Sequence, residues 1–208
     1  MKKTTQINHF LHDRLIAYRK VMHVFFTLLL ISSSTLLISK TNTMRASFAF
    51  KGDTILLPSP NGENLLFYLQ RNPNANTVIY ELNYTKEGSL NPENPVIGSW
   101  IRYSEQGQHK ELNSIEKKFA YGVQSKFLGK DEYEIRLAAY KKLPMYLKKA
   151  ASDKKYHMYV HINNKQLLLK RVFVGVKGGS LWFPKVQYID LFGTDASSGK
   201  ELIHRIKI

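Results

Sequence analysis

A strand-like alternation of apolar and polar residues, repeated from Asn64 to the end of the chain, limits the possible folds most strongly. Segments rich in aromatic and β-branched residues recur about every ten residues, with turn-forming residues between them, as in a sandwich or barrel. In the second of these segments, the alternation places Val78 and Tyr80 on the inner face and Thr77 on a wetter one. The predicted strands are residues 65–71, 77–83, 96–103, 119–127, 133–140, 145–149, 156–163, 166–177, 181–191 and 201–208.

The same pattern decides the fold class. Helical periodicity is nearly absent after Asn64, apart from residues 111–118, which predict one short helix. We find no internal repeat, low-complexity tract or linker in this part of the chain. The prediction is an all-β, mainly antiparallel domain: a single β-sandwich or barrel-like body of about ten strands with one short helix, preceded by an N-terminal hydrophobic targeting helix.

The first 49 residues have the composition of a membrane-targeting segment. Residues 1–20 carry five basic residues and one acid, and no Asp, Glu, Lys or Arg occurs in the apolar stretch from residue 21 to residue 39. A stretch of about 19 residues is near the lower limit for crossing a bilayer, so residues 1–49 are predicted to be either a cleaved signal peptide or an uncleaved N-terminal membrane anchor. A buried core helix of a cytosolic protein is the alternative, but it leaves the basic flank unexplained.

The basic flank also predicts where the rest of the chain resides. By the positive-inside rule it favours a cytoplasmic N-terminus, so residues 50–208 are expected outside the cytoplasm. The predicted location is therefore the periplasm, either free or anchored to the inner membrane through residues 21–39 if the leader is uncleaved. The predicted domains are residues 1–49 as the leader and residues 50–208 as the exported β domain.

The charge of the exported part restricts its partners only loosely. It holds 24 basic and 15 acidic residues, a net charge of +9, spread as pairs rather than in one run. Such a surface can attract anionic lipid headgroups or acidic glycans. We expect no nucleic-acid partner, because no zinc-finger spacing or RNA-binding motif is present.

Several residue patterns approach catalytic or metal-binding motifs without matching them. The chain has no cysteine, which excludes disulfides, cysteine-rich zinc sites and thiolate nucleophiles. His157 and His161 lie about 13 Å apart if they sit on one strand, too far for a shared metal ion. The segment from Gly193 to Lys200 has the wrong spacing for a phosphate-binding loop and predicts a hairpin with glycine at positive φ. We therefore predict no catalytic residue, no metal site and no cofactor.

The combination of aromatic residues with arginine is the feature most suggestive of recognition. Trp100 and Arg102 close one predicted strand, Phe119 and Tyr121 open another, and Arg71 ends the first. Arginine beside aromatic rings can build a binding patch. The alternative is that Trp100 and Phe119 belong to the core, with the arginines extending from strand ends into solvent.

Several blocks together resemble a known family. They are residues 64–71, 74–80, 100–103, 118–122 and 188–193, followed by Gly199 and Lys200. From about Leu56 to Ile208, the chain is similar to the bacterial domain-of-unknown-function family 4833. The resemblance implies single-domain exported bacterial proteins and assigns no reaction, ligand or catalytic residue. The Gln-Arg, Trp-Ile-Arg-Tyr and Phe-Ala-Tyr-Gly segments that the chain shares with this family indicate four candidate binding residues: Gln70, Arg71, Arg102 and Tyr121.

Three functions remain open from the sequence. The first is a non-enzymatic envelope module that binds a small ligand, a lipid or an envelope protein partner on a β scaffold. The second is a hydrolase of an envelope polymer, with a site assembled from scattered His, Asp and Glu residues. The third is electrostatic binding of acidic lipid or glycan, which high salt would weaken.

Overall fold

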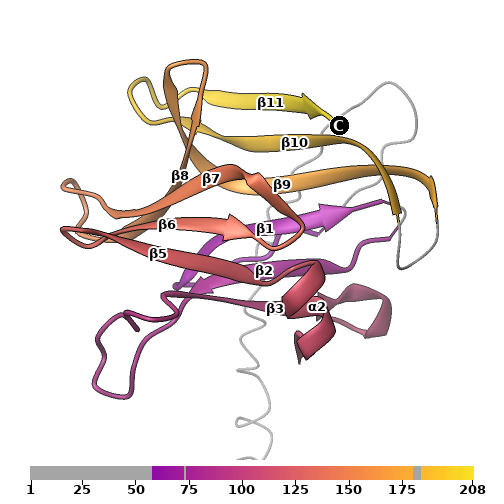
Figure 1. Ribbon diagram of the computed structural model, residues 1–208, viewed down its shortest axis with the longest axis horizontal. Helices are drawn as coiled ribbons and strands as arrows, with labels where there is room; N and C mark the ends of the chain where they lie inside the picture. Colours follow the sequence, from indigo (N-terminus) through magenta and orange to yellow (C-terminus); the bar gives the residue numbers. More distant parts are fainter. Residues whose placement is uncertain (1–57, 73, 180–183) are drawn as a thin grey trace, which may run out of the picture. The chain divides into compact units, whose positions relative to one another are not determined.

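The protein is described by a computed structural model that covers residues 58–72, 74–179 and 184–208 (Figure 1). These residues form eleven strands, one short 3-10 helix and one α-helix. The elements are β1 (Leu65–Arg71), β2 (Thr77–Leu82), β3 (Val96–Arg102), η1 (Tyr103–Glu105), β4 (Gln108–Glu111), α2 (Ser114–Phe119), β5 (Val123–Gly129), β6 (Glu132–Leu137), β7 (Tyr140–Lys149), β8 (Tyr156–Ile162), β9 (Lys165–Gly179), β10 (Pro184–Asp195) and β11 (Glu201–Lys207).

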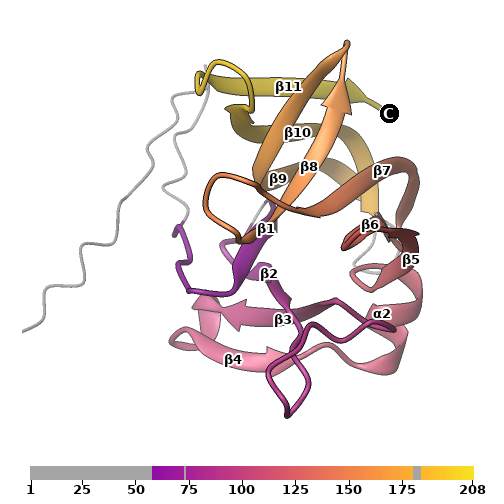
Figure 2. The ribbon, with the colours of Figure 1, turned by 90° about the vertical axis from the view of Figure 1, so that its left-hand side faces the viewer.

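The long strand β9 organises the sheet. The strand order is β4-β3-β2-β1-β9-β8-β7-β6-β5, and β10 pairs with β9 on one side and with β11 on the other. Because β10 follows β9 along one edge, β8 and β1 share the other edge: β8 pairs with residues 165–168 and β1 with residues 171–174. From this edge, one series of strands continues from β1 to β4 and the other from β8 to β5. The two series diverge, and the sheet curls into a half-barrel (Figure 2).

The main core fills the concave side of this sheet. Phe67 of β1 and Tyr80 of β2 stack with their ring centroids 4.5 Å apart, and Leu191 of β10 lies in the same cluster. Alternation explains the membership, since Phe67 and Leu69 point to one side of β1 and Tyr68 to the other. Each fully buried large apolar side chain contributes about 1.5–3 kcal/mol relative to exposure, so this cluster is the principal stabilising feature of the domain.

The predicted fold class is confirmed: the described part is mostly β, mainly antiparallel, with one short α-helix at the predicted place. The parallel pairing of β1 with β9 is the exception to antiparallel order among the described strands. β4 was not predicted, because its sequence QHKE is exposed at all four positions and carries no apolar alternation. Such an edge strand is specified by its pairing with β3 rather than by its own sequence.

Two predictions about burial are wrong. Thr77 is fully buried rather than wet, because Tyr68, Ile79 and Ile101 form a second apolar cluster on the other side of β1 to β3. Phe119 is neither in a strand nor in the core: it is the last residue of α2 and is 65% exposed. Trp100, in contrast, is buried as a core residue at 6% exposure.

The predicted leader and the boundary at residue 50 lie outside the described residues. Within the described part of the chain, no helix is both long enough and apolar enough to cross a membrane.

Candidate ligand-binding site

A largely apolar cavity of about 510 Å³ lies on the concave side of the sheet, bounded by α2, β1, β3, β9 and β10. We call it the α2 pocket. Its walls include Leu69 of β1, Val172 and Val174 of β9, and Val186 and Ile189 of β10. These side chains share the inner face of their strands, so the pocket is a continuation of the core that is open to solvent.

Arg71 is the last residue of β1 and points into the α2 pocket from the same side as Leu69. Its side chain is half-buried. No hydrogen bond or ion pair connects its guanidinium to any residue that the structure describes. A cation beside apolar walls without a counter-charge favours an anion in its vicinity.

Arg102 is the second cation of the pocket and ends β3. Its guanidinium carbon lies 4.6 Å from the centroid of the Trp100 ring, within the range of a cation–π contact. Its Nη2 atom is 3.8 Å from Oε1 of Glu116, so its charge is partly balanced. Its Nε atom is buried and has no hydrogen-bond partner in the described part of the chain.

Glu116 links α2 to β3 at the pocket. Asn113 caps α2, and the side chain of Glu116 accepts a hydrogen bond of 2.9 Å from the Asn113 amide in return, completing a capping box. The Nε1–H group of Trp100 donates to Oε1 of Glu116 over 3.2 Å. The carboxylate therefore has a structural role that fixes α2 against the end of β3.

Tyr121 follows α2 and completes this wall of the pocket. Its ring meets Trp100 edge-on with centroids 4.8 Å apart, and its backbone oxygen accepts a hydrogen bond of 2.9 Å from the Tyr80 hydroxyl. Burial raises the pKa of the Tyr121 hydroxyl, although Arg71 acts in the opposite direction. The hydroxyl is therefore protonated at neutral pH and can donate a hydrogen bond to a ligand.

Three of the four predicted binding residues thus line one cavity: Arg71, Arg102 and Tyr121. Gln70 does not. It is fully buried on the opposite side of β1, where its Nε2 group donates to the Pro58 oxygen over 2.7 Å and to the Thr77 hydroxyl over 3.0 Å. Its Oε1 atom has no hydrogen-bond partner among the described residues.

The sequence reasoning did not identify Glu116 or the two asparagines of the pocket. Glu116 was recognisable from the Asn-x-x-Glu capping pattern that begins at Asn113. Asn76 carries no such signal, because its role depends on contact with η1: its side-chain oxygen accepts hydrogen bonds from the amide and the hydroxyl of Ser104. Asn74 also lines the pocket and comes from the same β1–β2 loop.

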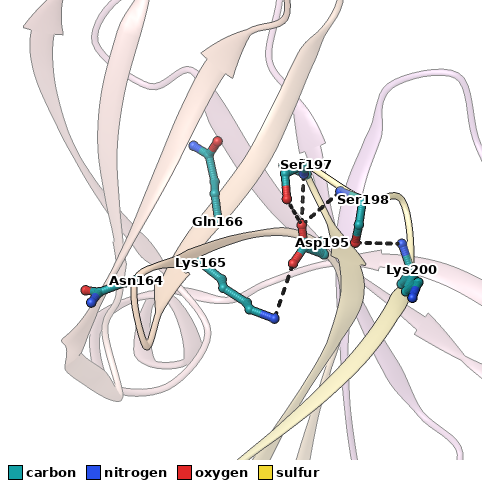
Figure 3. A pocket seen from close by; sticks show the side chains of 8 residues that line it. Asn164, Lys165, Gln166, Asp195, Ser197, Ser198 and Lys200 are labelled. Atoms are coloured by element: carbon teal, nitrogen blue, oxygen red, sulfur yellow. Dashed lines mark hydrogen bonds and ion pairs between the residues drawn. The ribbon is translucent and has the colours of Figure 1, made fainter.

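A second, more polar cavity of about 540 Å³ lies beside the hairpin that joins β10 to β11 (Figure 3). The hairpin contains Gly199 at a φ of 68°, as predicted. The amides of Ser197 and Ser198 donate to the Asp195 carboxylate over 2.9 Å and 3.1 Å. Because the carboxylate already accepts from these amides, they are not directed at a bound phosphate group.

The hydrogen bonds to the Asp195 carboxylate should make the stability of the domain depend on pH. The hydrogen bonds from Ser197 and Ser198 lower the pKa of the Asp195 carboxyl to about 2. A lowered pKa means that the stabilisation is complete above the ordinary value of about 4 and is lost as the pH falls towards 2. Between pH 4 and pH 2, the thermal midpoint of the wild type should fall more steeply than that of Asp195→Asn, whose amide does not titrate. Parallel curves in thermal denaturation would contradict this assignment.

The histidines in the described part of the chain do not line the α2 pocket. His157 and His161 are both on β8; His157 pairs with Asp153 at 2.8 Å, and His161 contacts the ring of Tyr146. The described residues contain no group of three His, Asp or Glu side chains that could hold a metal ion.

Comparison with known proteins gives a family but no function. No curated protein and no solved structure is similar enough to the chain to count as a match. The model of one family, described as a domain of unknown function, DUF4833, matches residues 67–205. This range contains β2 to β10 completely and includes Arg71, Arg102 and Tyr121. The chain therefore belongs to the DUF4833 family.

Proposed function

We propose that this protein is a non-enzymatic module of the bacterial envelope that binds an amphipathic anion, such as a fatty acid or an alkyl phosphate, in the α2 pocket. The observation that carries the proposal is the position of Arg71 and Arg102 beside an apolar cavity of about 510 Å³. The location in the envelope rests separately on the prediction that residues 1–49 are a membrane-targeting segment.

The size and lining of the pocket support a ligand with a hydrocarbon part. Ligand sites usually enclose about 300–1,000 Å³ and combine apolar walls with a few polar groups. The valines and leucines of the α2 pocket gain from displacing water with an apolar group. A purely polar solute would leave these walls without a matching partner.

The charges of the pocket support an anionic headgroup. Arg71 has no counter-charge among the described residues, whereas Glu116 is shared between Trp100 and Arg102. A guanidinium can donate two parallel hydrogen bonds to a carboxylate or phosphate, which gives strong and oriented binding. The protonated Tyr121 hydroxyl adds a further donor on the same wall.

Binding of dodecyl phosphate to the full chain, measured by isothermal titration calorimetry below its micelle concentration, tests the proposal. Arg71→Met should weaken binding by roughly 10- to 100-fold, because a hydrogen bond to a charged group contributes about 1.5–3 kcal/mol. The same variant should leave the affinity for dodecanol almost unchanged, since dodecanol carries no charge.

Arg136→Met is the matched control. Arg136 is paired with Glu134 on β6 and is not part of the pocket, so its replacement should not affect binding. Equal affinities for dodecyl phosphate and dodecanol in the wild type would contradict an anionic site. An equal loss in the Arg71→Met and Arg136→Met variants would show that general positive charge, rather than the pocket, attracts the ligand.

A further inference from the structure

The mouth of the α2 pocket exposes apolar side chains. Ile115 and Phe119 lie four residues apart on one side of α2 and are 57% and 65% exposed, and both line the pocket. Ile208 lines the same cavity and is 59% exposed. No residue of α2 is buried. Soluble domains rarely gather large exposed apolar residues at one place unless the surface contacts something.

Basic residues of α2 lie beside this apolar mouth. Lys117 and Lys118 belong to the last turn of α2, and the Lys118 ammonium lies 5.1 Å from the centroid of the Phe119 ring.

We propose that the mouth of the α2 pocket docks on an anionic bilayer surface, with Ile115 and Phe119 inserted below the headgroups and the α2 lysines, Lys117 and Lys118, on the phosphates. Interfacial helices combine a small apolar face with flanking basic residues in this way. Each lysine near an anionic surface strengthens binding by roughly fivefold. A protein partner fits less well, because protein interfaces are depleted in lysine.

Docking in this orientation faces the pocket opening towards the membrane. An amphipathic ligand then enters the pocket directly from the bilayer. Its hydrocarbon part moves first along the apolar side chains of the mouth, and its headgroup follows until it reaches Arg71 and Arg102. This pathway rests on the proposed function. The docking itself does not, and it can be measured with no ligand other than the vesicle lipids.

The absence of cysteine from the chain allows a direct test by single labels. Phe119→Cys and, separately, Phe127→Cys are introduced into the full-length protein and labelled with an environment-sensitive fluorophore. Phe127 is the matched control, since it is 59% exposed but lies on β5 outside the pocket. Because each label sits in the same full chain, attachment of any other segment to the membrane affects both equally.

With vesicles containing phosphatidylglycerol, the label at position 119 should shift to the blue and be quenched by brominated lipid, whereas the label at position 127 should change little. Lys117→Glu with Lys118→Glu should reduce the bound fraction at position 119 by at least tenfold. No shift at position 119, equal shifts at positions 119 and 127, or an equal response with pure phosphatidylcholine would each overturn the proposal. Loss of dodecyl phosphate binding with docking retained would instead remove the proposed function alone.

Discussion

Gly193→Ala should destabilise the domain by more than about 3 kcal/mol. Gly193 lies within β10, and a Cβ atom at this position would come within 2.0 Å of the backbone oxygen of Leu168 on β9. A flexible side chain could move away from such a contact, but a strand backbone cannot move without breaking its hydrogen bonds. The segment of β9 next to this point pairs with β8 and with β1, so the displacement would affect both halves of the sheet.

The measurement is the free energy of unfolding from denaturant titration. Gly62→Ala is the matched control, because a Cβ atom at Gly62 would meet its nearest neighbours at ordinary contact distances of 3.7 Å and 3.8 Å. That variant should stay within about 0.5 kcal/mol of the wild type. Equal stability of the two variants would contradict the close approach of β9 and β10 at Gly193.

Arg205→Met should lower the free energy of unfolding at pH 7 by about 3 kcal/mol. Asp190 of β10 is 1% exposed, and the Nε and Nη2 atoms of Arg205 on β11 each lie 2.7 Å from one of its oxygens. The variant leaves a buried carboxylate without this partner. The expected loss is at the low end for a broken buried pair, because the Arg205 side chain is 41% exposed and solvent screens its charge.

Two further variants check this explanation by denaturant titration. Asp190→Asn combined with Arg205→Met removes the buried charge together with its partner, and it should recover a large part of the loss. Arg136→Met, which breaks a more exposed pair with Glu134, should change stability little. If the double variant is no more stable than Arg205→Met alone, the loss comes from packing of the arginine rather than from the buried charge.

The fold could be predicted because alternation with period two is visible in the sequence, as in β8, where Met158 and Val160 are both fully buried. The parallel pairing of β1 with β9 could not, because it joins residues about 100 positions apart and leaves no local signal. The burial of Thr77 has the same origin, since it depends on residues that cover the second side of β2. Alternation in the sequence indicates which residues lie on the same side of a strand, but it does not indicate whether other residues of the protein cover that side.

The candidate site shows the same division. Arg71 and Arg102 lie at the ends of strands that both pair with β2, so the sheet brings them to one cavity, while α2 supplies Glu116 and the segment after α2 supplies Tyr121. Gln70 precedes Arg71 directly and must therefore point to the other side of β1, which strand geometry alone predicts. Export through the N-terminal leader stays a prediction, because that segment lies outside the described residues.

The most direct measurement is a crystal structure of the protein with dodecyl phosphate bound. The central claim predicts phosphate oxygens within hydrogen-bond distance of the Arg71 guanidinium, with the alkyl chain lying between α2 and the valines of β9. A phosphate bound instead beside Lys165 and Lys200 of the second cavity, with the α2 pocket filled only by water, would contradict it.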